Sequence, residues 1–275
     1  MPDTGRLAVV ACGAIARHVG DVAVRRGWPV DVHPLPPLLH NRPERIAAAV
    51  ERSVRDLRPR YARVAVGYAD CGTRGALDDV CRRLGTPRLP GSDCYGLFAG
   101  AARLRGLLEA EPGTYVLTDY LVTSFHRSVV VELGLDRFPQ LRDDYFGHYR
   151  RVVWLAQHPT ARLRAAAGRA ADALGLPWEE VVVGDVLLEG ALQDLLGEDL
   201  PGEDPGGGAG ARSGEGTAAR VRPLDGDREG DGRAAVGRRD AGRGRHLPTS
   251  ATVTWTLWSS ASAHDHVIGP AEPSG

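Results

Sequence analysis

The chain has 275 residues, and its 34 basic and 35 acidic residues give a formal net charge of -1 at pH 7. This length accommodates one large α/β domain or two small ones, and the near-zero charge gives no overall attraction to nucleic acid or anionic lipid. The sequence has no apolar run of about 18 residues, so it predicts no membrane span. Its start, MPDTGRLAVV, lacks the basic and apolar regions of a signal peptide, which favours a cytoplasmic location.

Short runs rich in Val, Ala and Leu alternate with longer stretches whose apolar residues recur at helical spacing. We expect strands over residues 7–12, 28–33, 63–69, 86–91, 114–119, 151–156 and 179–185. We expect helices over residues 13–27, 43–57, 75–85, 95–111, 121–134 and 160–175. Asn41 is the expected N-cap of the second helix, since Glu44 follows it three residues later.

This strict alternation indicates the fold class. Strands that alternate with helices need crossover connections, so the sequence predicts an α/β fold with one doubly wound, mainly parallel sheet and helices on both faces, Rossmann-like. Ligands of such sheets bind outside the carboxyl ends of the strands. The residues at those strand ends are therefore the first candidates for a functional site.

The periodic pattern stops near Leu200. We expect residues 6–197 to form the α/β domain, and residues 198–275 to form a disordered tail, because that segment is rich in Gly, Arg and Asp and has little apolar surface to bury. A shifted reading frame in GC-rich DNA would give the same composition. The alternative is therefore that the tail is not native sequence.

Three of the four cysteines stand where a strand or loop leads into a helix. Cys12 closes the first strand, Cys71 follows the third, Cys94 lies in GSDCYG, and His40 precedes a helix in LLHNRPER. Helix N-termini stabilise thiolates, and three thiolates that converge need a cation. Cys₃His suits zinc, while three cysteines with an open position also suit an iron–sulfur cluster. The alternative is ordinary core packing, which we assign to Cys81.

Neighbouring residues suggest a second chemistry. Asp70, beside Cys71, is a candidate base or a residue that orients a histidine. A metal-free enzyme would then use Cys71 as nucleophile, His40 as base and Asp70 as orienter. Arg42 and Arg74 are candidates to bind an anionic group of a cofactor, although solvated helix residues have the same pattern.

Two other polar residues are expected to have structural rather than catalytic roles. Asp119, in LTDY after a strand, fits a helix N-cap better than a base. His18, on the first helix, is expected at the surface. The chain has no GxGxxG, GxxxxGK[ST], HExxH or GxSxG, so the common phosphate loops and hydrolase signatures are excluded.

The stretches ACGAIA, LPPLLHNRPERI, VGYADCGTRGALD, CYGLFAG and LRDDYFGHYRRVVWLAQ resemble the domain-of-unknown-function 1638 family, from about residue 6 to about residue 195. The resemblance implies motifs ACGA, LLHNRPE, ADCG and CYE, which fall here on Cys12, His40, Cys71 and Cys94. The family pattern has an acid after CY, and this chain has Gly96. If that acid is catalytic, this protein binds without turnover. The resemblance also associates some relatives with corrinoid-dependent methyl transfer.

These observations predict a cytosolic protein with a Cys₃His metal site of zinc or an iron–sulfur cluster. It would act as a metal-dependent transferase or hydrolase on a small-molecule substrate, without nucleic acid or membrane partners. Two alternatives stay open: the metal-free cysteine enzyme, and a non-catalytic accessory protein that binds a corrinoid or metal. Whether the protein is an enzyme is left undecided by the sequence.

Overall fold

The computed structural model describes residues 3–197, Leu200 and residues 220–221. The expectations for the tail, residues 198–275, therefore fall almost entirely outside the described residues. The strands are β1 (Asp3–Cys12), β2 (Val30–Leu35), β3 (Tyr61–Gly67), β4 (Thr114–Thr118), β5 (Arg151–Ala156), β6 (Trp178–Val182) and β7 (Arg220–Val221).

The α-helices are α1 (Ala16–Arg25), α2 (Ile46–Leu57), α3 (Ala76–Leu84), α4 (Cys94–Ala99), α5 (Ala101–Ala110), α6 (Asp119–Phe125), α7 (Arg142–Phe146), α8 (Ala161–Leu174) and α9 (Val186–Leu196). Short 3₁₀ helices are η1 (Pro37–Asn41), η2 (Pro43–Arg45) and η4 (Pro139–Leu141), and η3 (His126–Val131) is a π-helix. Among the described residues, no helix is both long and apolar enough to cross a membrane.

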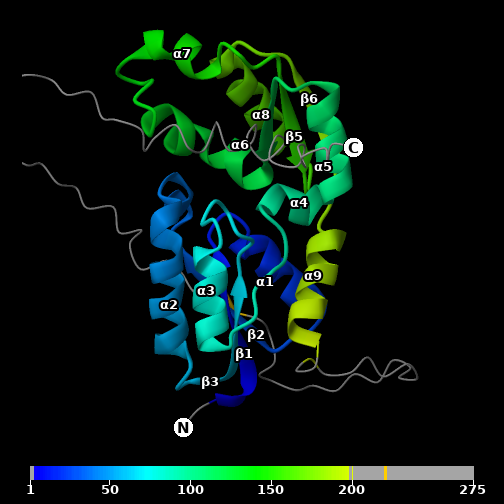
Figure 1. The fold of residues 1–275 in the computed structure, drawn as a ribbon. Helices are drawn as coiled ribbons and strands as arrows, with labels where there is room; N and C mark the ends of the chain where they lie inside the picture. Colours follow the sequence, from blue (N-terminus) through cyan, green and yellow to red (C-terminus); the bar gives the residue numbers. More distant parts are fainter. Residues whose placement is uncertain (1–2, 198–199, 201–219, 222–275) are drawn as a thin grey trace, which may run out of the picture.

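The predicted α/β class with parallel strands is confirmed, but the strands form two sheets instead of one. One sheet has the order β3-β1-β2-β7 and the other has the order β4-β5-β6, and every pair in both is parallel. Figure 1 shows the two sheets in separate lobes. We call residues 3–94 with 186–196 the N-lobe and residues 95–183 the C-lobe.

The expected strand at residues 86–91 does not form, and this segment lies along the chain between β3 and β4, which belong to different sheets. Only a single bridge, between Val66 and Arg88, joins this segment to β3. The chain then enters α4, whose first residue, Cys94, packs in the N-lobe core while the next, Tyr95, packs in the C-lobe core. Helix α4 is thus the forward connection between the lobes.

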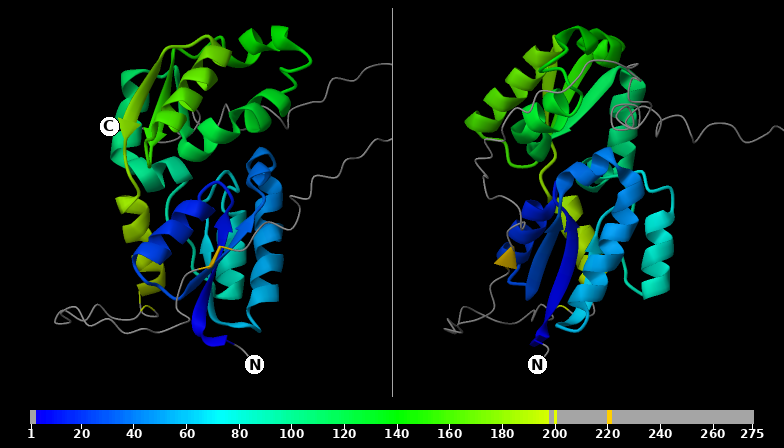
Figure 2. Two further views of the ribbon diagram at one scale, coloured as in Figure 1. Left: turned by 180° about the vertical axis from the view of Figure 1, so that it is seen from behind. Right: turned by 90° about the vertical axis from the view of Figure 1, so that its left-hand side faces the viewer.

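Helix α9, which the sequence did not predict, brings the chain back to the N-lobe. It lies beside α1 and α4, as both views in Figure 2 agree. Its buried leucines, Leu188, Leu192, Leu195 and Leu196, belong to the same hydrophobic core as β1 and β3. The N-lobe core is therefore completed by residues of α9, which lie about 100 positions after α4 in the chain.

Three further expectations were wrong in detail. The helix expected over residues 95–111 breaks at Gly100, whose φ of 78° suits glycine. The helix expected over residues 121–134 starts at Asp119 and becomes a π-helix after Phe125. Asn41 does not cap α2, since Arg45 is the N-cap; the Asn41 side chain instead donates a hydrogen bond to Glu132 Oε2 at 3.3 Å.

Candidate functional site

The predicted thiol residues meet at the carboxyl edge of the N-lobe sheet. Cys12 is the last residue of β1, Cys71 follows its neighbour β3, and His40 lies in η1 after β2. The Nε2 atom of His40 lies 3.6 Å from the Cys12 sulfur, and its Nδ1 atom lies 3.0 Å from the carbonyl oxygen of Pro37. We call Cys12, His40, Cys71 and Cys94 the thiol cluster.

Cys94 approaches the same place from α4. The Asp93 side chain caps this helix by accepting a hydrogen bond from the Gly96 amide at 2.8 Å, which fixes Cys94 at the helix start. His40, Cys71 and Cys94 line one cavity of about 300 Å³, and Cys12 is buried behind His40. All four cysteines of the chain are free thiols.

Burial controls the charge of these thiols. It raises the pKa of Cys12 to about 12, although the amides of Ala14 and Ile15 partly oppose the shift. Burial also raises the pKa of Cys71 and Cys94. Burial alone would lower the pKa of His40, but its hydrogen bond with Cys71 raises it above the ordinary value. At neutral pH the cluster thus consists of neutral thiols unless a bound cation displaces their protons.

The thiol cluster does not form the closed cage expected for zinc. Within the described ranges, the one group of three or more possible ligands whose atoms all lie within 4.8 Å of one another excludes every member of the cluster. Cys71 and Cys12 are still near enough to add to the effect of burial in raising the pKa of Cys94. The four residues therefore lie in one region of the N-lobe, as expected. Their ligand atoms are not close enough together to form a tetrahedral Cys₃His site without movement of the side chains.

The Asp70 side chain holds its own loop. It accepts hydrogen bonds from the hydroxyl of Thr73 at 2.5 Å and from the amides of Arg74 and Gly75. These bonds stabilise a turn in which Cys71 and Arg74 have φ values of 50° and 53°, a conformation that costs energy outside glycine. Asp70 is thus a residue that shapes the turn rather than one that orients His40.

The two arginines proposed for cofactor binding are placed differently. Arg74 is exposed and lines the 300 Å³ cavity. Arg42 is exposed between η1 and η2 and lies outside the residues that line that cavity. Cys81 packs in the core from α3 and does not line that cavity.

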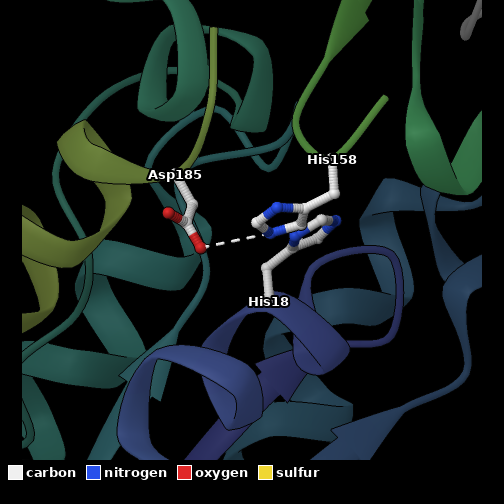
Figure 3. Close-up of side chains that lie close together, drawn as sticks. All are labelled: His18, His158 and Asp185. Carbon is white, nitrogen blue, oxygen red and sulfur yellow. Dashed lines mark ion pairs between the residues drawn. The ribbon is translucent and has the colours of Figure 1, made fainter. Parts of the chain in front are cut away.

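A second group of side chains lies at the junction of the lobes. His18 of α1, His158 after β5 and Asp185 at the N-cap of α9 place one ligand atom each within 4.8 Å of the others. Figure 3 shows the two imidazole rings stacked, with Asp185 turned towards His158. The rings are 5.3 Å apart between centroids and inclined by 19°. We call these three residues the histidine–aspartate group.

The sequence analysis missed this group. His18 was expected at the surface, but it is buried against Phe98 and His158. Its ligand partners stand about 140 and 167 positions later, so no local motif joins them. A weaker signal exists in the sequence: His158 and Asp185 both follow strand-like runs, as Asp119 does. Asp119 also does more than start α6, since it accepts the amide hydrogens of Gln157 and His158.

Comparison with known proteins supports the resemblance stated above. No curated protein and no solved structure matches the chain. Residues 34–192, more than half of the chain, match the family described as "Protein of unknown function (DUF1638)". The match includes His40, Cys71 and Cys94, and it begins after Cys12. The chain therefore belongs to the DUF1638 family.

Proposed function

We propose that this protein binds a thiophilic metal centre through the thiol cluster, and that the adjacent cavity admits a small molecule to that centre. One observation carries the proposal: His40, Cys71 and Cys94, from three separate segments, line one cavity, and the Cys12 sulfur lies 3.6 Å from His40 Nε2. Arg74 and Glu44 also line the cavity, so its wall carries both charges. A polar substrate would meet them on its way to the centre.

The spacing of the sulfurs favours a cluster over a single zinc ion. The four ligands of one zinc must lie close together around it, and the thiol cluster does not. In a [4Fe–4S] cluster each cysteine sulfur binds a different iron, so the sulfurs lie further apart than around one zinc ion. Three cysteines would leave one iron for His40 or for a substrate. A zinc site would require the side chains to move inward.

A metal-free cysteine enzyme is the second candidate. Cys71 has the positive φ that often accompanies a functional residue, and its side chain hydrogen-bonds to His40. Its raised pKa opposes this role, because the thiolate is the nucleophile. In this mechanism Cys71 alone would be essential, whereas a ligand set requires Cys12 and Cys94 as well.

Metal analysis tests the proposal. The protein is purified anaerobically without chelator, and its iron, zinc, cobalt and sulfide contents are measured with its absorption spectrum. Cys12→Ser, Cys71→Ser and Cys94→Ser should each lose bound iron, while the matched control Cys81→Ser keeps it. Equal metal content in all four variants would overturn the proposal. Loss of reactivity in Cys71→Ser alone, without metal in the wild type, would support the nucleophile.

A substitution at Gly96 tests metal binding separately from catalytic turnover. A Cβ atom at Gly96 would meet only Asp93 Oδ1, at an ordinary 3.6 Å, so a larger residue fits there. We expect Gly96→Glu to fold and to keep the metal. If the acid of the family pattern is catalytic, the variant gains an activity that the wild type lacks. The corrinoid association stays a prediction, and visible cobalt-dependent absorption in the same preparation would support it.

A further inference from the structure

We propose that His18, His158 and Asp185 form a second metal site, which takes a divalent transition ion such as zinc and joins the two lobes. The site is separate from the thiol cluster and does not depend on the function proposed for it. Two imidazoles and one carboxylate are ligands that zinc and ferrous iron accept, and three protein ligands leave coordination positions open. The chemistry of the group is therefore that of an accessible centre rather than a closed structural one.

The distances fit such an ion. The Nε2 atom of His158 lies 3.3 Å from Asp185 Oδ2. Two ligands of a tetrahedral ion with bonds of about 2.0–2.1 Å lie roughly 3.3 Å apart. The remaining ligand atom, on His18, is within 4.8 Å of both, and the His18 ring would have to turn out of its stack with His158 to bind the same ion. Figure 3 shows Asp185 turned towards His158 and the His18 ring stacked against the His158 ring.

Two atoms of the group are buried without a hydrogen bond. Among the described residues, His18 Nδ1 has no hydrogen-bond partner, and Asp185 Oδ2 has none beyond its 3.3 Å ion-pair contact with His158. Native proteins rarely leave buried polar atoms unsatisfied, and coordination to a metal ion would satisfy both atoms at once.

Residues around the group hold its ligands in place. Arg25 donates a hydrogen bond to Asp185 Oδ1 at 3.1 Å, which leaves Oδ2 for the ion. Asp119 accepts the backbone amide of His158 at 2.8 Å and the indole N–H of Trp154 at 2.9 Å. Phe98 meets the His18 ring edge-on. Outer partners of this kind orient metal ligands and tune their affinity.

The imidazoles also line a cavity of about 700 Å³ between the lobes. Gly13 after β1, Asp119 after β4 and His158 after β5 all border it, so strand ends of both sheets meet there. The side chain of His158 is 48% exposed, which leaves the group accessible. A ligand in this cavity would reach the open positions of the bound ion.

The test uses zinc as the probe on the full chain, after dialysis against chelator and then against chelator-free buffer. Calorimetric titration should show one zinc per chain that is lost in His158→Gln and kept in His126→Gln, a substitution of an exposed histidine outside the group. The affinity in His158→Gln should fall more than about a hundredfold, since even outer-partner changes cost 10–100-fold. Equal affinity in the two variants would overturn the proposal.

X-ray absorption at the zinc edge separates this site from the thiol cluster. Nitrogen and oxygen ligands lie at about 2.0–2.1 Å from zinc, and sulfur lies at about 2.3 Å. The nitrogen and oxygen shell should vanish in His158→Gln and persist in Cys71→Ser. Zinc that is bound only through sulfur would overturn the second site and leave the thiol proposal intact. Binding should also raise Tm by roughly 5–10 °C at a hundredfold excess over Kd.

Discussion

The two lobes have similar sheets but are assembled in different ways. Each has three neighbouring parallel strands covered by helices. The C-lobe core comes from one continuous stretch and is rich in aromatic residues, including Tyr115, Phe146, Tyr149 and Trp154. The N-lobe core needs α9, which arrives only after the whole C-lobe has been made. The N-lobe therefore cannot complete its core without the chain that passes through the C-lobe.

The two candidate sites are also distributed differently over the lobes. All members of the thiol cluster belong to the N-lobe, whereas the histidine–aspartate group takes one residue from each lobe and one from the start of α9. In the first group, Cys12, His40 and Cys71 end or follow strands of a single sheet, and Cys94 joins them from the start of α4. The second exists only because the two lobes pack with the carboxyl ends of β1, β4 and β5 around one cavity.

The largest expected loss of stability tests the N-lobe itself. Arg6 and Asp31 form a buried ion pair with an N–O distance of 2.5 Å, and Tyr61 donates a further hydrogen bond to Asp31. Asp31→Asn leaves the Arg6 charge without its carboxylate, so we expect a loss of roughly 3–5 kcal/mol in urea unfolding. The control Asp79→Asn, at an exposed ion pair with Arg82, should change stability by less than about 1 kcal/mol.

The same residue predicts a pH dependence. Burial raises the pKa of Asp31, but the hydrogen bonds from Arg6 and Tyr61 outweigh it and hold the pKa below its usual value. Stability from this group is therefore complete above the unfolded pKa of about 3.9 and is lost as pH falls through the lower folded value. Asp31→Asn should flatten this acid limb of the stability profile. An unchanged limb would contradict the assignment.

The next largest expected effect tests how much α9 stabilises the N-lobe core. Leu188 is fully buried in the N-lobe core, and its neighbour Leu187 is 50% exposed. Leu188→Ala should cost roughly 2–5 kcal/mol, while Leu187→Ala stays within about 0.5 kcal/mol. Hydrogen exchange then locates the loss: amides of β1 and β3 should exchange faster, with β4 and β5 less affected. Uniform acceleration in both sheets would mean that the lobes unfold together.

The smallest effect tests the joint between the lobes. Gly100, between α4 and α5, has a φ of 78°, and a Cβ atom there would lie 3.3 Å from Leu187 Cδ1. Gly100→Ala should cost about 1–2 kcal/mol in thermal unfolding. Gly106 lies within α5 with open space around it, so Gly106→Ala should stabilise by about 0.5–1 kcal/mol. Equal effects would show that the break at Gly100 is not required.

Strand ends were the most predictable feature of this chain. The runs before Cys12 and Cys71 are short, apolar and followed by glycine, so they indicate buried strands that end in turns. Parallel pairing then places both ends at one edge. Asn41 shows the limit: its sequence pattern suits a helix cap, but Asn41 ends the 3₁₀ turn η1, and a second 3₁₀ turn, η2, intervenes before α2.

Other features depend on contacts that no local pattern records. The segment at residues 86–91 has a strand-like sequence, but it gains only one bridge to β3 and never becomes a sheet strand. His18 is a polar residue that we expected at the surface of α1, but Phe98 and the His158 loop cover it. In both cases the deciding partners lie in segments distant along the chain.

By itself, the sequence determined the α/β class, most strand positions and the convergence of Cys12, His40, Cys71 and Cys94, because apolar periodicity and strand-end geometry are local. Only the tertiary structure decided that the strands form two sheets, that α9 completes the N-lobe, and that His18, His158 and Asp185 meet. The physical reason is that the hydrophobic effect favours burial of whichever apolar surfaces fit against each other. Those surfaces come from residues far apart in the chain, so no local sequence pattern reveals them.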